Sequence, residues 1–269
     1  MITASIVTHN ANHIDLSRVI DCVMRSSIKL LFIIDNSPND ELRSFVKDNP
    51  RIIYIFSQNL GYGAGHNIGI KKAIELDADF HAVLNPDIYW ENDIIESIEK
   101  YMDSNLDVGQ VMPKVFYPNG DLQYLCKMCP SPIDLIFKRF LPKSLTRSRL
   151  EKFQLKQTGY SKQMNVPYLS GCFMFFRVKA LKEIGLFDER FFMYPEDIDI
   201  TRRMHAKYRT MFLPDVSIIH AHAAASKTNK KMLLVHIKNM IKYFNKWGWF
   251  FDKQRKEFNK QLLKEISTL

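Results

Sequence analysis

Short apolar runs alternate with amphipathic stretches through the first hundred or so residues of the chain. Runs rich in β-branched residues predict strands at Ile2–Thr8, Lys29–Ile34, Arg51–Ser57 and Phe80–Leu84. Helical spacing of the apolar residues predicts helices at His13–Arg25, Asn39–Asp48, His66–Leu76 and Glu91–Asp103. This order predicts an α/β fold on a Rossmann-like, doubly wound and mostly parallel central sheet, with helices on both faces.

The pattern is less regular beyond residue 105. Further strands are predicted at Val108–Tyr117, Val166–Arg177, Thr210–Leu213 and Val216–His220, and helices at Val178–Ile184 and Glu196–Lys207. Residues 130–163 are rich in Lys and Arg with few clean periods, which predicts a mobile excursion over the side where ligands bind. We therefore expect a domain over residues 1–226, with halves at 1–105 and 106–226.

Residues 227–269 differ from the rest in charge. They hold 11 Lys or Arg and 3 Asp or Glu, whereas the remaining residues hold 27 and 26, so this segment carries most of the net charge of +9. Because basic residues do not dominate the main domain, no nucleic-acid partner is expected. At about 100° per residue, residues 230–251 form a helix with an apolar face and a lysine face. This predicts an amphipathic tail that either packs on the domain or lies in a membrane interface.

Cysteines and the chain start point to the cytoplasm. The pair Cys126 and Cys129 has no second pair, which favours free thiols over a zinc site. The chain opens without a basic and apolar leader, so no signal peptide is expected. No apolar run approaches the roughly 20 residues that span a bilayer.

Polar residues follow several predicted strands. Asp35, Asn59 and Asp87 come just after strand ends, and ligands of open α/β sheets bind beyond the carboxyl ends of strands. Between Asn59 and Asn67, three glycines alternate but fail the G-x-G-x-x-G spacing of dinucleotide-binding loops, which argues against a dehydrogenase. Close approach to a ligand is favoured over a simple turn.

Two segments carry residues suited to a metal ion. In Asn85-Pro86-Asp87, the carboxylate is either a ligand for a hard divalent cation or a helix cap, and the two interpretations stay open. His220 and His222 are two apart on a strand and point to the same side, which suits a metal or a pyrophosphate.

An acidic cluster follows an aromatic run at residues 191–194. Glu196, Asp197 and Asp199 begin a predicted helix, where acidic residues complement the helix dipole. That explanation covers one or two of the three carboxylates. An ionised Asp facing a cleft can also take a proton from an incoming hydroxyl. Arg202 and Arg203 either pair with these carboxylates or contact phosphate.

Together these segments resemble the family 2 glycosyltransferases, which have the GT-A fold, over about residues 2–226. The matching segments are Ser5–Asn10 (with His9 where an aromatic is usual), Asp35, Asn59–Asn67, Asn85–Asp87, Ser170–Met174, Phe187–Tyr194, Glu196-Asp197 and Pro214–His220. Asn85 departs from the family, because it replaces the first acid of the D-x-D metal motif.

The resemblance implies roles for individual residues. It implies nucleotide-sugar binding by Thr8, Asn10, Asp35, Asn59, Gly63, Asn67, Asn85 and Asp87. It implies Mg²⁺ or Mn²⁺ held by Asp87 and His220, with Asp197 as the catalytic base of an inverting transfer. Acceptor binding would fall to Gly171, Glu196 and Asp199, the two acids orienting groups rather than acting as base.

The resemblance also implies substrates. It is closest to bacterial O-antigen rhamnosyltransferases, which implies dTDP-β-L-rhamnose and a lipid-diphosphate-linked sugar acceptor at the inner face of the cell membrane. The basic tail would favour peripheral contact with that anionic surface. Galactosyl or other hexosyl transfer remains open, as does a non-catalytic nucleotide-sugar-binding protein, which Asn85 motivates.

Overall fold

The computed structural model describes residues 1–46, 49–136, 142–221 and 230–268. Its strands are β1 (Ile2–Thr8), β2 (Leu30–Asp35), β3 (Ile52–Phe56), β4 (Phe80–Leu84), β5 (Ile88–Tyr89), β6 (Val108–Phe116), β7 (Cys126–Lys127), β8 (Met164–Asn165), β9 (Tyr168–Leu169), β10 (Phe173–Arg177) and β11 (Arg209–His220). Its helices are α1 (His13–Arg25), α2 (Leu42–Phe45), α3 (Tyr62–Glu75), α4 (Ile94–Asp103), α5 (Pro132–Leu135), α6 (Lys143–Phe153), the short 3₁₀ helix η2 (Lys156–Thr158), α7 (Val178–Ile184), α8 (Glu196–His205), α9 (Lys230–Trp247) and α10 (Lys253–Ser267).

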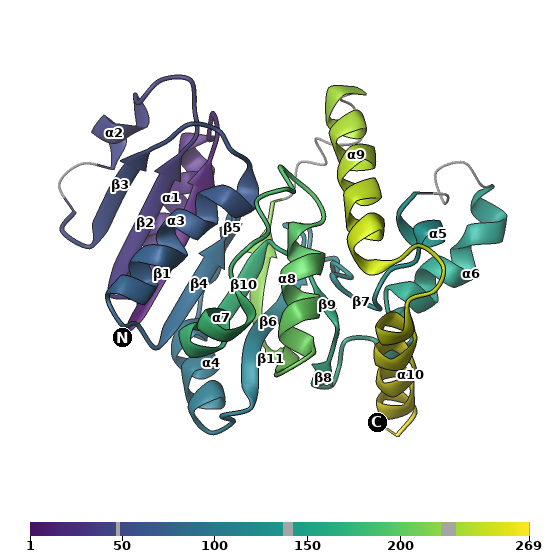
Figure 1. Cartoon of the computed structure of the whole chain (residues 1–269). Coiled ribbons are helices and arrows are strands. Elements are labelled where there is room, and N and C mark those ends of the chain that lie inside the picture. Colours follow the sequence, from purple (N-terminus) through teal and green to yellow (C-terminus); the bar gives the residue numbers. More distant parts are fainter. Residues whose placement is uncertain (47–48, 137–141, 222–229, 269) are drawn as a thin grey trace.

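The central sheet is mixed, and its order is β3-β2-β1-β4-β10-β6-β11-β5, with β8 paired to β11 (Figure 1). Strands β3, β2, β1 and β4 are parallel, as is the pair β6 and β11, whereas β10 runs antiparallel to both of its neighbours. A separate small sheet pairs β7 with β9. Because β10 is reversed, its first residue Phe173 lies opposite Leu84, the last residue of β4. The segment before β10 therefore joins the edge of the sheet where β1, β2 and β4 end.

Helices cover both faces of the sheet, as predicted. Apolar residues of α1 and α4 join the main core cluster on one face, and those of α3, α7 and α8 form a second cluster on the other. Helix α1 begins at Asn12, whose side chain accepts the N–H of Ile14, and Leu16, Val19 and Val23 form its buried face. Strand β4 is buried along its whole length because both faces are covered.

Several predicted boundaries differ from the structure. The predicted helix Asn39–Asp48 is a single short helix, α2, in the described residues. The two strands predicted at 210–220 form one strand, β11, with an irregularity between Leu213 and Ser217. Pro214 lies within this irregularity and cannot donate to the ladder, which explains the break in the pattern. The predicted strand Val166–Arg177 is divided into β9 and β10 by a turn at 170–172.

Residues 130–163 are more ordered in secondary structure than their composition predicts. Their described part contains α5, α6 and η2. Leu155 and Tyr160 are buried in the main core, and the Tyr160 hydroxyl donates to the carbonyl of Cys126 at 2.5 Å and accepts its N–H at 2.9 Å. The expectation of few regular elements is therefore wrong for these residues, and Tyr160 contacts β7. The predicted mobility of the segment stays a prediction.

The tail consists of two helices rather than one. Helix α9 ends at Trp247, where Gly248 has a φ of +96°, and α10 follows. Met240, Tyr243 and Phe244 of α9 are buried in a cluster with Phe191 and Ile198. Figure 1 shows α9, α10, α5 and α6 grouped at the end of the molecule opposite β3. The predicted packing of the tail on the domain is thus present, and its predicted boundary at 226/227 lies outside the described residues.

Buried charges fix these tail helices to α8. Arg202 of α8 forms two hydrogen bonds to Asp252, at 2.6 and 2.8 Å, and its guanidinium lies 4.1 Å from the centre of the Trp247 ring. Both members of the ion pair are almost completely buried. Among the described helices, none is both long and apolar enough to cross a membrane.

Candidate active site

Three of the predicted nucleotide-binding residues lie together where β1 and β2 end. Thr8 and Asp35 are paired in the sheet register, and the Thr8 hydroxyl is buried without a hydrogen-bond partner in the described chain. The buried Asp35 carboxylate accepts the Tyr54 hydroxyl at 2.7 Å and the Ser37 N–H at 2.9 Å. The N–H of Asn10 donates to the Ser37 hydroxyl at 2.8 Å. This edge presents polar groups in a fixed arrangement.

The alternating glycines are part of helix α3 and its N-terminal cap. Gly61 has a φ of +101°, and a Cβ there would lie 2.1 Å from the carbonyl oxygen of Phe192. A Cβ on Gly63 would lie 2.9 Å from the Cβ of Phe187. The close approach that Gly61 and Gly63 permit is therefore to the protein's own residues 187–192. Nucleotide binding by Gly63 stays a prediction.

The two asparagines that flank these glycines have different surroundings. Asn59 is exposed, and its side-chain oxygen accepts the N–H of Gly61 at 3.2 Å. Asn67 is buried; its amide donates to the Phe187 carbonyl and to Glu189, each at 2.9 Å, and accepts the Phe187 N–H at 3.0 Å. Asn67 thus holds the loop at 187–189 onto α3. Their predicted contact with the nucleotide stays a prediction.

Asp87 and His220 meet at the end of the sheet. The His220 Nε2 lies 3.3 Å from the Asp87 Oδ1, and the Asn85 side-chain nitrogen lies 3.5 Å from the same Nε2. Gln123 donates its Nε2 to the His220 carbonyl at 2.8 Å, so its Oε1 faces the His220 Nδ1 at 3.1 Å. An Nδ1 proton held by Gln123 leaves Nε2 directed at Asp87, the arrangement that orients metal-binding histidines. His222 lies outside the described residues.

The pair formed by Asp87 and His220 fits a cation completed by substrate. Mg²⁺ and Mn²⁺ accept carboxylate and imidazole ligands, and Mg²⁺ sites commonly combine one or two protein carboxylates with phosphate oxygens. Within the described ranges, no three His, Cys, Asp or Glu side chains gather as a metal centre. Diphosphate oxygens and water are ligands that would complete the coordination of a cation held by this pair.

The protonation of His220 is set by its neighbours. Burial disfavours the imidazolium, but hydrogen bonds to Asp87 and to Cys172 outweigh burial and raise the pKa of His220 to about 10. The proton on His220 and a divalent cation therefore compete for the same pair of ligands.

The predicted base, Asp197, is held by backbone donors. Its two oxygens accept the N–H of Gly171 at 3.0 Å and that of Ile198 at 2.8 Å. A Cβ on Gly171 would lie 3.2 Å from the Cβ of Asp197 and 3.6 Å from the Tyr62 ring. The Tyr62 hydroxyl donates to the Gly171 carbonyl at 2.5 Å. Gly171 is thus enclosed between Asp197 and Tyr62.

The same turn joins the predicted base to the predicted metal pair. The carbonyl of Cys172, next to Gly171, accepts the N–H of Asn85 at 3.0 Å. Burial raises the pKa of the Tyr62 hydroxyl, and nearby negative groups that include Asp197 and Asp87 raise it further. The carboxylates of Asp197 and Asp87 therefore both affect the pKa of the Tyr62 hydroxyl, and the structure brings the two carboxylates to the same region.

Burial also shifts the acidic cluster itself. It raises the pKa of Glu196 well above the usual value, an effect that the charge of Asp197 reinforces, and the Glu196 Oε2 has no hydrogen-bond partner in the described chain. Burial raises the pKa of Asp197, whereas the nearby Lys127 ammonium lowers it. The two acids share a low-dielectric site in which charge is costly.

Lys127 lies near the predicted base, and the sequence pattern did not indicate it. It lies on β7 opposite Tyr168 of β9, and its Nζ is 4.7 Å from the centre of the Tyr168 ring. Burial lowers the pKa of Lys127, and the charge of Asp197 acts in the opposite direction. No local pattern distinguishes this lysine from others, because only the pairing of β7 with β9 places it near Asp197.

A cavity of about 520 Å³ opens beside both parts of this site. Gln123, the partner of His220, and Lys127, the neighbour of Asp197, both line it. Tyr124 and Lys156 form another part of its wall, where the Lys156 Nζ lies 4.8 Å from the centre of the Tyr124 ring. The cavity offers cations and aromatic faces to a polar ligand.

Asp199 is held in a different environment from Asp197. Its carboxylate is fully buried and contacts Arg203 at 2.9 Å, Lys246 at 2.6 Å and the Trp247 indole N–H at 2.8 Å. These partners belong to α8 and α9, so the contacts of Asp199 join the tail to the domain. Its predicted role in acceptor binding is untested.

This architecture places polar strand ends, a carboxylate–imidazole pair and a separate carboxylate at one edge of an α/β sheet. The model of the family described as Glycosyl transferase family 2 matches residues 3–185, which is more than half of the chain. The chain belongs to that family.

Named relatives agree with this class. An N-acetylglucosaminyl-diphospho-decaprenol L-rhamnosyltransferase of Mycobacterium tuberculosis is 28% identical over 178 residues, covering 61% of this chain and 57% of the relative. The rhamnosyltransferase WbbL of Escherichia coli K12 is 26% identical over 220 residues, covering 79% and 81%. The chain thus matches little more than half the length of the mycobacterial protein.

Among solved structures, GalNAc-T7 with UDP, GalNAc and Mn²⁺ superimposes with a TM-score of 0.68 at 14% identity, covering 92% of this chain and 48% of that one. At this identity the likeness shows the fold alone. The predicted fold class and the predicted membership of the family 2 glycosyltransferases are confirmed.

Proposed function

We propose that this chain transfers L-rhamnose from dTDP-rhamnose to a lipid-linked glycan acceptor during synthesis of a bacterial surface polysaccharide. The names of its relatives support this choice: two are rhamnosyltransferases, and one of these is named for a diphospho-decaprenol-linked acceptor. Transfer of galactose or of another hexose by the same site is the alternative.

The observation that carries the proposal is the joint position of two acidic groups. Asp197 is fixed by the Gly171 N–H, and Asn85, two residues before Asp87, is fixed by the carbonyl of Cys172. One carboxylate is thus available to the acceptor and the other to the diphosphate of the donor. A transferase that inverts configuration needs these two functions on opposite sides of the reacting carbon.

The proposed reaction uses the residues as follows. Thr8, Asn10 and Asp35 bind the nucleoside, and Asp87 with His220 holds Mg²⁺ or Mn²⁺. A divalent cation held there would neutralise negative charge on the departing diphosphate. Asp197 accepts the proton of the acceptor hydroxyl, whose oxygen forms a bond to the anomeric carbon. The bond from that carbon to the diphosphate oxygen breaks, and the electron pair leaves with the nucleotide.

A donor panel tests this proposal. Thermal shifts with dTDP-, UDP- and GDP-sugars should show the largest stabilisation with dTDP-rhamnose, because ligand binding to the folded state raises its stability. Release of dTDP should require Mn²⁺ or Mg²⁺ and should be lost in Asp87→Asn. Preference for UDP-galactose would instead establish the alternative donor.

A non-catalytic binding protein is the second candidate, because Asn85 stands where an acid is usual. Sustained, metal-dependent release of nucleotide diphosphate from the donor rejects it. Donor binding with no release, in the presence of acceptor and metal, would support it.

Peripheral contact with the inner face of the membrane is a further part of the proposal. Phe250 and Phe251 are exposed at the turn between α9 and α10, at 66% and 93%, and Lys253 and Lys256 line a hollow together with Phe251. Phe250→Ser with Phe251→Ser should reduce binding to anionic vesicles and leave the fold intact. Equal vesicle binding by this variant and the original chain contradicts a membrane role for the turn.

A further inference from the structure

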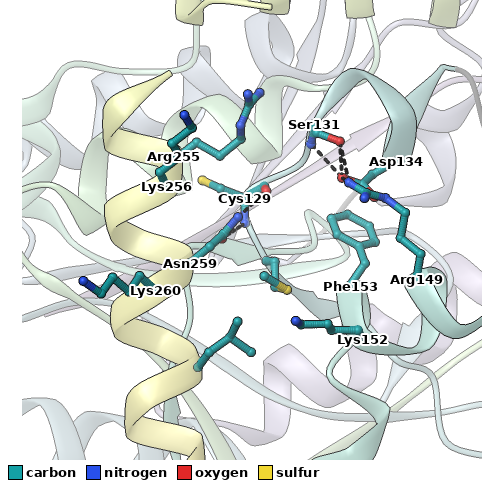
Figure 2. Close-up of a pocket in the computed structure, with 12 residues that line it drawn as sticks. Cys129, Ser131, Asp134, Arg149, Lys152, Phe153, Arg255, Lys256, Asn259 and Lys260 are labelled. Atoms are coloured by element: carbon teal, nitrogen blue, oxygen red, sulfur yellow. Dashed lines mark hydrogen bonds and ion pairs between the residues drawn. The ribbon is translucent and has the colours of Figure 1, made fainter. Parts of the chain in front are cut away.

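A second cavity of about 520 Å³ lies between α10, α6 and the segment that follows β7 (Figure 2). Five basic side chains line it, and Asp134 is the acidic member among its described lining residues. The basic residues are Arg149, Lys152, Arg255, Lys256 and Lys260. The excess of positive charge indicates an anionic ligand.

The carboxylate in this cavity is already neutralised. Arg149 contacts the two oxygens of Asp134 at 2.8 and 3.2 Å, and Asp134 also accepts the Ser131 hydroxyl at 2.6 Å. In Figure 2 these three side chains point toward one another at one wall. Asp134 therefore leaves the other cations of the cavity uncompensated.

Three lysines supply that free charge. Lys256 and Lys260 are four residues apart and so lie on the same side of α10, while Lys152 lies on α6 across the cavity (Figure 2). No carboxylate of the described residues lies within ion-pair distance of these three ammonium groups. Cations from two separate helices therefore line the same cavity.

The walls of the cavity are fixed by contacts of their own. The Asn259 side chain accepts the N–H of Cys129 at 2.8 Å and donates to its carbonyl at 3.0 Å, which attaches α10 to the segment after β7. Arg255 is buried, and its guanidinium reaches the Pro130 carbonyl at 3.4 Å. The backbone of α10, which carries Lys256 and Lys260, is therefore attached to this segment before any ligand arrives.

The cavity also has an apolar side. Met128, Phe153 and Leu263 line it together with the cations. Lys256 lines both this cavity and a neighbouring hollow that contains the exposed Phe251. A ligand with a charged head and a hydrocarbon chain matches this combination better than a free inorganic anion does.

Its position relates the cavity to the active site. Met128 and Cys129 line the cavity, and they directly follow Lys127, the cation next to Asp197. Consecutive residues are about 3.8 Å apart along the chain. The segment that lines the cavity is therefore continuous with the strand that carries Lys127.

We propose that this cavity binds the diphosphate of the lipid-linked acceptor, with the first part of the lipid chain against its apolar side. The inference rests on the proposed function, because it assigns a site to the acceptor of that reaction. It identifies Lys152, Lys256 and Lys260 as binding residues that act on the acceptor and not on the nucleotide sugar.

The test uses the full chain with farnesyl diphosphate as the probe. The pocket variant carries Lys152→Gln, Lys256→Gln and Lys260→Gln. The control variant carries Lys29→Gln, Lys179→Gln and Lys207→Gln, which removes the same charge from exposed positions outside the cavity. The pocket variant should bind farnesyl diphosphate at least about tenfold more weakly, since each lost phosphate contact weakens binding severalfold. The control variant should bind it like the original chain.

Kinetics and vesicle binding separate the remaining outcomes. With a lipid-diphosphate-linked acceptor, the pocket variant should show a KM raised by about tenfold and unchanged metal-dependent hydrolysis of the donor. Equal losses in the pocket and control variants would overturn the assignment. So would unaltered farnesyl diphosphate binding with reduced binding to vesicles containing phosphatidylglycerol, because the cavity would then serve bulk anionic lipid. An original chain that neither binds nor hydrolyses any nucleotide sugar would refute the proposed function on a separate measurement.

Discussion

Substitution of Asp197 and of Asp199, two acids on the first turn of α8, separates chemistry from stability. In Asp197→Asn, one oxygen still accepts a backbone N–H, and the new amide nitrogen faces the other donor, either Gly171 or Ile198. Leaving that buried N–H unpaired costs about 1–3 kcal/mol. Removal of a half-buried carboxylate whose pKa is raised by burial offsets part of this cost. The free energy of unfolding should therefore fall by less than about 3 kcal/mol.

The effect of Asp197→Asn on turnover should be much larger. An asparagine cannot accept the proton of the acceptor hydroxyl, and loss of a general base lowers rates by about 10²–10⁴-fold. The affinity for dTDP-rhamnose should be unchanged, because the predicted nucleotide site lies at the ends of β1 and β2. Turnover is measured by dTDP release under saturating acceptor, donor affinity by calorimetry, and stability by urea denaturation.

Asp199→Asn is the matched comparison. It replaces a fully buried carboxylate that pairs with Arg203 and Lys246 by a neutral amide. Removal of one member of a buried ion pair lowers the free energy of unfolding by about 3–5 kcal/mol. Stability should fall more than in Asp197→Asn, whereas turnover per folded molecule should fall less. Turnover of Asp197→Asn within about tenfold of the original would remove Asp197 from the base role. A hundredfold or larger loss in Asp199→Asn at unchanged stability would establish its predicted role in acceptor binding.

Three further perturbations examine the surroundings of this site. Turnover requires ionised Asp197, so the rate should fall as pH drops through the raised pKa of this group. Lys127→Met removes a positive charge that lowers this pKa, so the acidic limb of the pH–rate profile should move to higher pH. An acidic limb at the same pH in this variant would contradict an interaction between Lys127 and Asp197. Gly171→Ala places a Cβ 3.2 Å from that of Asp197, and the resulting shift of the base should reduce kcat by about 10²-fold with little change in donor affinity. Asp252→Ala leaves the Arg202 guanidinium buried without its carboxylate partner and should reduce the free energy of unfolding by about 3–5 kcal/mol. A reduction below about 1 kcal/mol, the size expected for a surface ion pair, would show that this contact does not fix the tail to the domain.

The apolar pattern was sufficient for the regular first half of the fold and not for the second. Strands β1 and β4 and helix α1 have the predicted bounds, because each is a simple run bounded by polar or turn residues. In contrast, residues 164–177 form three short strands whose partners are distant in sequence. Local periodicity cannot predict pairings of this kind, since two-residue strands are set by their neighbours.

The candidate site shows the same division. The residue types of Asp87, Asp197 and His220 mark them as chemically capable, and their places at element ends were evident from the pattern. Neither its residue type nor its position in the sequence distinguishes Lys127, although its charge lowers the pKa of the Asp197 carboxylate. The glycines of α3 were expected to approach a ligand, and the atoms that fill the space beside Gly63 belong to Phe187. Which group faces a ligand and which faces the protein depends on contacts between distant segments.

By itself, the sequence determined the α/β class, the order of the main elements, the basic amphipathic tail and the identity of the acids and the histidine that suit glycosyl transfer. Those properties follow from side-chain chemistry and from the spacing of apolar residues, which repeats every two residues along a strand and every 3.6 along a helix. Both depend only on residues close together in the sequence. Tertiary structure alone decided that β10 is reversed, that α9 and α10 pack on α8, and that five cations surround one cavity. Packing of apolar surfaces and compensation of buried charge govern such arrangements, and both depend on residues far apart in the chain.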